Sequence, residues 1–264
     1  MKFYSKEKLV NQSRIKEEDR IELIKALDKI EQSTRYFSFE FTKFLSPSIY
    51  QLVKDYLIPE EFELSFIGGH KKSERKVVIA KPSYMNINEK DVPITALEVS
   101  YSKKYSNISH GDILGTLMAS GIKREFVGDI YVYDDFSHVL VLKSIVDYFK
   151  MNISKVRHSP VSIKEIALSQ VKYKESDYKI IQTTINSNRI DAIIASGFAL
   201  DRKTSKKKVM NEMVKVNHRL IDSPHIELGE EDLISVKGEG RIIIDEINGF
   251  SKKNRLKITI KKMI

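Results

Sequence analysis

The chain of 264 residues contains no cysteine. It can therefore form no disulfide, thiolate nucleophile or Cys-ligated zinc site, and this composition suits a reducing compartment. Long apolar runs are missing too: no segment approaches the roughly 20 apolar residues of a membrane-spanning helix, and the first residues lack the apolar stretch of a signal peptide. We expect a cytoplasmic protein without membrane insertion.

Motifs of common enzyme classes are also missing. The six histidines show neither H-x-x-x-H nor H-E-x-x-H spacing. There is no H-I-G-H or K-M-S-K-S element, and the glycines Gly238 and Gly240 are not followed by the third glycine of a dinucleotide-binding fingerprint. The sequence therefore predicts no catalytic residue, no metal and no cofactor, and we expect a protein that is not an enzyme.

Positive charge is in excess. Lys and Arg number 45 against 36 Asp and Glu, which gives a net charge of +9 and a pI of about 9.3. From Asn188 onward there are 16 basic and 11 acidic residues, so +5 of this charge lies in the last 77 residues. This balance favours an anionic partner, most often nucleic acid and next an acidic membrane.

Hydrophobic periodicity predicts an α+β protein of three parts. Residues 1–60 indicate a helical subdomain, with one helix over Asp19–Gln32 and another beginning at Ser46-Pro47. Residues 61–182 change to period two and indicate an α+β domain similar to the RNA-recognition-motif (RRM) fold. Residues 183–264 form the third part, and we place its boundary near Thr183.

The middle part combines six predicted strands with two helices. One helix begins at Ser109, with Asp112 as its capping partner, and the other covers Lys143–Lys150. The predicted strands are Leu64–Ile67, Lys76–Ala80, Ile94–Tyr101, Asp129–Tyr133, His138–Leu142 and Val161–Ile166.

Two cationic segments of the middle part are candidates for secondary nucleic-acid contacts. A loop after Gly68-Gly69 carries Lys71, Lys72 and Arg75, and its cations and backbone amides could meet phosphates. The alternative is an ordinary charged hairpin turn. Lys123 and Arg124 follow the end of a helix, where the alternative is that they satisfy the helix dipole and the last carbonyls.

A compact basic region extends from Asn188 to Arg241. Arg189-Ile190-Asp191 opens a short apolar helix that Gly197 is expected to end, a second helix covers Arg202–Glu212, and Val214–Asn217 follows as a strand. Short strands containing Ile226, Leu228, Ile234 and Val236 come next, and a final strand with a basic edge is expected over Ser251–Ile264.

The second of these helices carries lysines at i, i+3 and i+4, namely Lys203, Lys206 and Lys207, so their ammonium groups project from one face. Lys215 and Asn217 point to the outer side of the following strand, and a turn at His218-Arg219 exposes two further contacts. We expect these elements to form one nucleic-acid-binding face, against the alternative of a solvated charged helix. The residues predicted to bind nucleic acid are Arg189, Arg202, Lys203, Lys206, Lys207, Lys215, Asn217, His218, Arg219, Arg241, Lys252 and Lys253.

This region resembles the S4 RNA-binding domain, and the whole chain resembles the bacterial YlmH-type S4 proteins. Three residues depart from the usual S4 pattern: Asp201, Lys208 and Glu212. The resemblance is carried by Arg189–Asp191, Asp201-Arg202, Val214–Asn217, Gly229–Val236, Gly238–Arg241, Gly121–Glu125, Gly128–Ile130 and Gly249–Lys253.

The resemblance implies a non-enzymatic RNA-binding factor of the translation machinery. YlmH-type proteins are implicated in ribosome-associated quality control, where 23S rRNA, tRNA and the 50S subunit with a stalled peptidyl-tRNA are the expected partners. Members are also associated with cell-division gene clusters. Two alternatives stay open: an RNA-modifying enzyme with its active site in the middle part, and an adaptor for cell-division proteins that uses RNA only incidentally.

Overall fold

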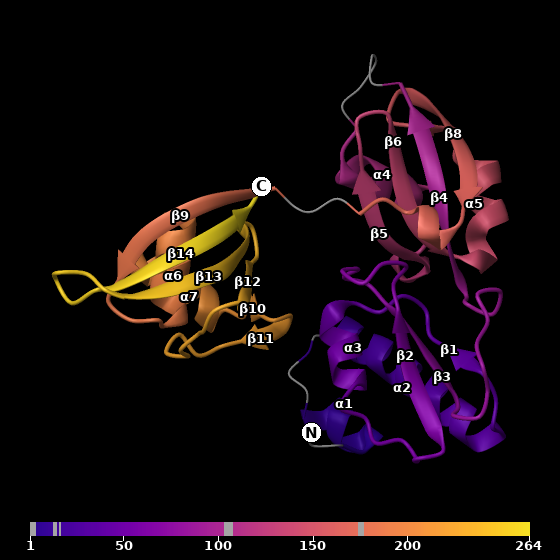
Figure 1. Ribbon diagram of the computed structural model, residues 1–264, viewed down its shortest axis with the longest axis horizontal. Coiled ribbons are helices and arrows are strands. Elements are labelled where there is room, and N and C mark those ends of the chain that lie inside the picture. The colour runs from indigo at the N-terminus through magenta and orange to yellow at the C-terminus, as the bar shows by residue number, and fades with distance from the viewer. Residues whose placement is uncertain (1–3, 13–14, 16, 103–107, 174–176) are drawn as a thin grey trace. The chain divides into compact units, whose positions relative to one another are not determined.

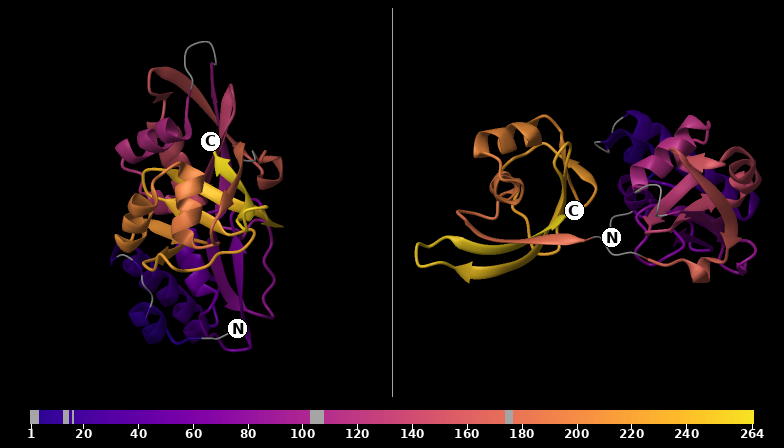
Figure 2. Two further views of the ribbon diagram at one scale, coloured as in Figure 1. Left: turned by 90° about the vertical axis from the view of Figure 1, so that its left-hand side faces the viewer. Right: turned by 90° about the horizontal axis from the view of Figure 1, so that it is seen from above.

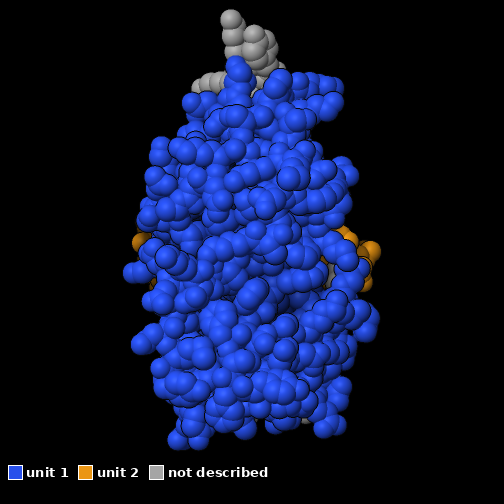
Figure 3. Space-filling model, turned by 90° about the vertical axis from the view of Figure 1, so that its right-hand side faces the viewer, with its two compact units in different colours: residues 1–174 blue, residues 175–264 orange. Residues whose placement is uncertain are grey.

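The computed structural model describes residues 4–12, 15, 17–102, 108–173 and 177–264. The chain divides into two compact units, residues 1–174 and 175–264, the first of which is shown in blue in Figure 3. The boundary lies earlier than the one expected near Thr183. Residues Tyr178–Ile185 form a strand, β9, that pairs along its whole length with the last strand, β14 (Leu256–Met263), so this segment belongs to the second unit.

The N-terminal lobe of the first unit comprises the described residues up to Pro82. It contains the helices α1 (Lys6–Gln12), α2 (Glu17–Tyr36) and α3 (Pro47–Val53). They pack on a three-stranded antiparallel sheet of order β1-β3-β2, built from β1 (Glu40–Phe41), β2 (Phe62–Ile67) and β3 (Val77–Pro82).

The lobe is therefore not purely helical, which corrects the expectation for residues 1–60. The apolar stripe of α2, formed by Leu23, Leu27 and Ile30, needs a cover, and residues Val78 and Ala80 of β3 supply it. The first two strands assigned from sequence to the middle part thus pack with the N-terminal helices instead.

The RRM-like lobe follows in the order strand, helix, strand, strand, helix, strand, with one additional two-residue strand, β7, before the last (Figure 1). Its sheet order β5-β6-β4-β8-β7 is the arrangement expected of a split βαβ fold, so the predicted similarity to the RRM fold is confirmed. The elements are β4 (Ile94–Tyr101), α4 (His110–Ala119), β5 (Val127–Val132), β6 (Phe136–Leu142), α5 (Val146–Asn152), β7 (Lys155–Val156) and β8 (Ser159–Ile166), with single 3-10 turns at Arg124–Phe126, Lys143–Ile145 and Leu168–Gln170.

Local sequence signals located these elements well. The strand predicted over Ile94–Tyr101 has these bounds in the structure. The helix after Ser109 has the predicted capping box: the Ser109 hydroxyl accepts from the Asp112 amide at 3.2 Å, and the Asp112 carboxylate accepts from the Ser109 amide at 2.9 Å.

The two lobes share a hydrophobic core, which makes them one unit. Helices α4 and α5 cover one face of the five-stranded sheet. The opposite face, through Ile94 and Leu140, packs against Phe44, Val77 and Ile79 of the N-terminal lobe. RNA-recognition motifs stack bases on this face, and here a large part of it is buried within the unit.

The segment after β8 covers a further part of the same face. The Tyr133 hydroxyl donates to the Lys172 carbonyl at 2.7 Å, and the Lys172 amide donates to His138 Nδ1 at 3.0 Å. The ring of Tyr173 stacks on His70 with centroids 4.5 Å apart. This face of the sheet is therefore covered both by the N-terminal lobe and by the segment after β8.

The second unit is a six-stranded antiparallel sheet of order β11-β10-β12-β13-β14-β9 with two helices on one side of it (Figure 2). Its core consists mainly of isoleucine and valine from both layers. In addition to β9 and β14, the elements are α6 (Ile190–Phe198), α7 (Arg202–Met210), β10 (Val214–Val216), β11 (Arg219–Ile221), β12 (Leu233–Val236) and β13 (Gly240–Phe250).

Three local predictions in this unit were wrong. The second helix ends at Met210 rather than Glu212, because Glu212 has a φ of 55° and turns the chain. Ile226 and Leu228 lie in no strand, although Glu227 between them forms an isolated antiparallel β-bridge with Arg189. Gly197 lies inside α6, which ends in a left-handed Ala199 with a φ of 55°.

Candidate nucleic-acid interface

Helix α7 presents an exposed cationic face. Its buried residues are Ser205 and Val209, which turn Lys203, Lys206 and Lys207 towards solvent. No carboxylate among the described residues forms an ion pair with any of these three lysines, whereas the neighbouring Lys208 pairs with Glu239 at 3.0 Å. Because no described carboxylate neutralises these three positive charges, the face is suited to bind a polyanion. We call it the α7 lysine face.

The start of α7 is fixed by a side-chain cap. The Asp201 carboxylate accepts a hydrogen bond from the Thr204 amide at 2.8 Å and from the Thr204 hydroxyl at 2.6 Å. These hydrogen bonds hold the pKa of Asp201 below its usual value. The cap stabilises the first turn of the helix, which contains Lys203, and so keeps this lysine on the same face as Lys206 and Lys207.

A buried carboxylate holds two of the predicted RNA-binding arginines. Asp191 is only 2% exposed, and it accepts from Arg189 Nε at 3.2 Å and Nη2 at 3.0 Å, and from Arg202 Nε at 3.3 Å. Burial would raise the pKa of Asp191, but the hydrogen bonds from Arg202 and Arg189 outweigh it and lower that pKa. The two guanidinium groups therefore tie the starts of α6 and α7 together, and one carboxylate leaves one of their charges unneutralised.

The turn after β10 lies one residue earlier than predicted. Asn217 and His218 have φ angles of 47° and 68° and connect Val216 to its cross-strand partner Arg219, which begins β11. The side-chain nitrogen Nδ2 of Asn217 donates to the Asp232 carboxylate at 2.7 Å, and its side-chain oxygen Oδ1 accepts from the Leu233 backbone amide at 3.0 Å. Asn217 therefore stabilises this turn, and its predicted contact with RNA stays a prediction.

The predicted single binding face is divided between the two sides of the sheet. Val214 and Val216 pack against the helices, so the alternating Lys215 points to the opposite side. There Lys215 lies opposite Ser235, which lies opposite Arg241 on the next strand. The α7 lysine face and this Lys215–Arg241 row are thus separate cationic surfaces of the second unit.

The last two predicted residues lie at a hairpin tip. Lys252 and Lys253 are exposed in the connection between β13 and β14, not within a strand that begins at Ser251, because β14 begins at Leu256. This hairpin extends beyond the rest of the sheet (Figure 1).

Two of the secondary candidates in the first unit are structural. The Arg75 guanidinium is directed inward and donates to the Phe44 carbonyl at 2.6 Å, and burial lowers its pKa. The Arg124 guanidinium donates to the Gly128 carbonyl at 3.1 Å, and burial lowers its pKa to about 10. Charge in the sequence did not reveal this burial. Lys71, Lys72 and Lys123 are exposed.

The cationic loop that precedes Arg75 is docked on the RRM-like lobe. The Asp129 carboxylate accepts from the backbone amides of Glu74 at 2.7 Å and Arg75 at 3.1 Å. Two backbone amides of the loop that was expected to bind phosphates thus donate their hydrogen bonds to a carboxylate of β5 instead. Burial raises the pKa of Asp129.

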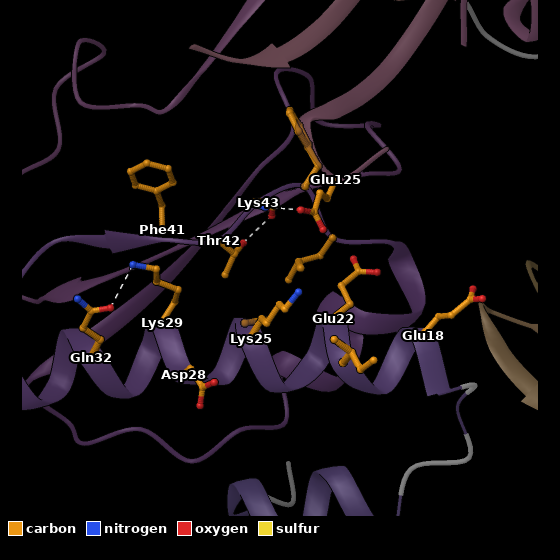
Figure 4. A pocket seen from close by; sticks show the side chains of 14 residues that line it. Glu18, Glu22, Lys25, Asp28, Lys29, Gln32, Phe41, Thr42, Lys43 and Glu125 are labelled. Atoms are coloured by element: carbon orange, nitrogen blue, oxygen red, sulfur yellow. Dashed lines mark hydrogen bonds and ion pairs between the residues drawn. The ribbon is translucent and has the colours of Figure 1, made fainter. Parts of the chain in front are cut away.

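A pocket of about 450 Å³ lies between α2 and the segment around β1 (Figure 4). Its floor is apolar at Ala26, Phe44 and Leu45. Because its charged lining has more carboxylates than ammonium groups, it does not suit a phosphate. The carboxylates are Glu18, Glu22, Asp28 and Glu125, and the ammonium groups are Lys25, Lys29 and Lys43.

The part of the chain that the structure describes offers neither a metal cluster nor a membrane span. Within it, no group of three or more His, Asp or Glu side chains is arranged to hold a metal ion. No helix in the same residues has the length and apolar character needed to cross a membrane.

Comparison with known proteins identifies the family. Residues 88–170 match a family model described as "Putative RNA-binding domain in YlmH". The chain is 30% identical over 226 residues to the Ribosome-associated protein quality control protein P2 of Bacillus subtilis, an alignment that covers 86% of this chain and 88% of that protein. The chain belongs to the YlmH family. The predicted resemblance to the YlmH-type proteins is thereby confirmed.

A solved structure of a YlmH protein agrees with this assignment. The Cell division protein ylmH from Streptococcus pneumoniae matches with a TM-score of 0.50 and 26% identity, over 60% of this chain and 96% of that chain. The YlmH family model covers most of the RRM-like lobe and ends before the second unit, so the α7 lysine face lies outside it.

Proposed function

We propose that the protein binds structured RNA without modifying it, and that the α7 lysine face of the second unit is its principal contact. The observation that carries the proposal is three exposed lysines on one helix face that no described carboxylate neutralises. The Asp201 cap and the Asp191 ion pairs fix this helix in place, so the ammonium groups are positioned before RNA arrives.

The RNA is proposed to be 23S rRNA or tRNA on the 50S subunit, in quality control of stalled peptidyl-tRNA complexes. The name of the Bacillus subtilis relative supports the ribosomal setting, and the description of the family model supports RNA as the ligand. Such a role places the protein in the cytoplasm with the ribosomes.

The test replaces Lys203, Lys206 and Lys207 together by Glu. A matched control makes the same charge change at Lys25, Lys90 and Lys155, which are exposed lysines of the first unit. Because each phosphate contact contributes through counterion release, we expect the α7 variant to lose affinity for 50S subunits or tRNA by on the order of 100-fold at 0.1 M salt. The control should lose much less.

Filter binding or sedimentation with 50S subunits measures this difference, and circular dichroism checks that both variants are folded. Equal losses in the two variants would mean that only net charge matters, and the α7 lysine face would then have no special role.

A second candidate function is that of an adaptor for cell-division proteins, which the name of the Streptococcus pneumoniae protein favours. It predicts that capture of division proteins by the intact chain survives nuclease treatment. Loss of all partners after nuclease treatment would leave RNA binding as the function.

A further inference from the structure

An exposed aromatic residue lies at the tip of the β13–β14 hairpin. Phe250, the last residue of β13, is 65% exposed. Strand β12 pairs with β13 only from Gly240 to Ile243, so the outer part of β13 extends past it with β14 as its partner. Figure 1 shows the tip projecting from the sheet. Phe250 is the cross-strand partner of Leu256, at the outer end of the apolar face of the sheet.

The connection that follows Phe250 is held by hydrogen bonds. The Ser251 amide donates to the Arg255 carbonyl at 2.7 Å, and the Asn254 amide donates to the Ser251 carbonyl at 2.9 Å. The Arg255 guanidinium donates to the Thr184 carbonyl of β9 at 2.6 Å, which anchors the tip to a third strand. The aromatic ring is therefore presented on an ordered support.

The residues that follow Phe250 in the sequence carry positive charge and no negative charge. Lys252 and Lys253 lie two and three residues after Phe250, and among the described residues no carboxylate forms an ion pair with either. From Ile247 to Ile264 the chain contains no Asp or Glu. A single exposed apolar residue needs no explanation by itself. An exposed aromatic ring followed in the sequence by two exposed lysines, however, is a combination with which proteins bind unpaired nucleotides, because the ring stacks on a base and the cations contact the backbone.

We propose that Phe250 stacks on an unpaired base of the bound RNA while Lys252 and Lys253 contact the adjacent phosphates. This inference rests on the proposed function and adds a second contact, which selects loops or single strands over continuous duplex. The α7 lysine face supplies charge, whereas the hairpin tip supplies the preference for unpaired nucleotides.

The first test compares binding of two RNAs to the full chain: a hairpin with an unpaired uridine loop, and a blunt duplex of equal length. Stacking on one base is worth about 5- to 150-fold in affinity, so Phe250→Ala should lose about that factor for the hairpin and little for the duplex. Its salt dependence should not change, because Phe is neutral. Lys252→Gln with Lys253→Gln should instead reduce the slope of log K against log salt by about 2.

Tyr84→Ala is the matched control, since Tyr84 is another exposed aromatic residue, 71% exposed, in the first unit. It should leave hairpin binding unchanged. Equal hairpin affinity of Phe250→Ala and the wild-type protein would overturn the stacking proposal.

The second test uses the absence of tryptophan from the chain. Phe250→Trp places a single tryptophan at the tip, and stacking on a base should quench its fluorescence on addition of the hairpin RNA. Tyr84→Trp should bind the same RNA without quenching. If Phe250→Trp binds RNA with unchanged fluorescence, or responds only to vesicles of anionic lipid, the inference is wrong.

The two proposals fail separately. Retained binding by Phe250→Ala with lost binding by the α7 variant would remove the stacking contact and leave the proposed function intact. A wild-type chain that binds neither 50S subunits nor tRNA would overturn both.

Discussion

Asp191 shows how one residue can determine the geometry of a cationic surface. Its carboxylate is buried and forms ion pairs with Arg189, which precedes α6, and with Arg202, the first residue of α7. Breaking a buried ion pair leaves charges without partners, and the exposure of Arg202 moderates that cost because water reaches it.

We expect Asp191→Asn to lower the free energy of unfolding at pH 7 by about 1–3 kcal/mol. The folded pKa of Asp191 is depressed, so its contribution is present above the unfolded pKa of about 3.9 and is lost as the pH falls through the folded value. Urea unfolding at pH 7 and near pH 3 measures this. The difference in the free energy of unfolding between wild type and variant should shrink at the lower pH.

The control variant is Asp147→Asn, at an exposed carboxylate of α5. It should change the free energy of unfolding by less than about 0.5 kcal/mol at both pH values.

Gly197 is required by close packing of α6 on the sheet. A Cβ added there would lie 2.6 Å from Ile242 Cδ1 and 3.4 Å from its Cγ2, and Ile242 is fully buried. We expect Gly197→Ala to destabilise the second unit by about 1–3 kcal/mol, because overpacking exceeds the gain in helix propensity.

Gly115 is the matched control for this substitution. It lies in α4, and an added Cβ there would meet nothing within 4 Å. Gly115→Ala should therefore stabilise the first unit, by roughly 0.5–1 kcal/mol. Thermal unfolding of both variants measures the contrast, and a stabilised Gly197→Ala would show that Ile242 moves aside freely.

At the scale of the element, helix α7 depends on the Asp201 cap. We expect Asp201→Ala to lower the midpoint of thermal unfolding by roughly 4 °C and to weaken RNA binding, because the first turn that carries Lys203 frays. Asp201→Asn can cap equally well, so it should retain both properties. A loss of RNA binding in Asp201→Asn as large as that in Asp201→Ala would point to the carboxylate charge rather than the cap.

The elements that sequence predicted well are those whose cause is local. Alternation located the strand Ile94–Tyr101, and the spacing of Ser109 and Asp112 located the start of α4. The Asn217-His218 turn had a local signal that was missed, because asparagine is one of the few residues that readily adopt a left-handed conformation. In contrast, the burial of Arg75 and Arg124 depends on lobe packing, which no charge pattern reveals.

At the scale of the whole molecule, the division into two units separates two candidate RNA-binding regions. The family model that names RNA covers residues 88–170, whereas the α7 lysine face and the hairpin tip lie in residues 175–264. The sheet face that stacks bases in RNA-recognition motifs is largely closed in the first unit.

We therefore expect a fragment of residues 175–264, which has its own core, to fold alone and retain most of the RNA affinity. A fragment ending at residue 173 should bind the same RNA at least about tenfold more weakly, because it lacks the phosphate contacts of the α7 lysine face. Circular dichroism and gel-shift titration of both fragments measure this. Tighter binding by the first fragment would assign the principal contact to the RRM-like lobe.

The grouping of strands at this scale was not predictable from periodicity. The sequence predicts strands over Leu64–Ile67 and Lys76–Ala80, which are observed as Phe62–Ile67 and Val77–Pro82, but it does not show which helices cover them. The boundary near Thr183 falls inside β9 for the same reason, because β14, the partner of this strand, comes more than 70 residues later in the sequence.

The pairing of β9 with β14 brings the two ends of the second unit together. The Ile264 amide donates to the Asp177 carbonyl at 3.0 Å, and Tyr178 lies opposite Met263. A folded module whose ends meet can be inserted into a surface loop of another protein without forcing that loop apart. The second unit is thus suited to insertion into a surface loop of an unrelated host protein, where its proposed RNA binding could be measured apart from the first unit.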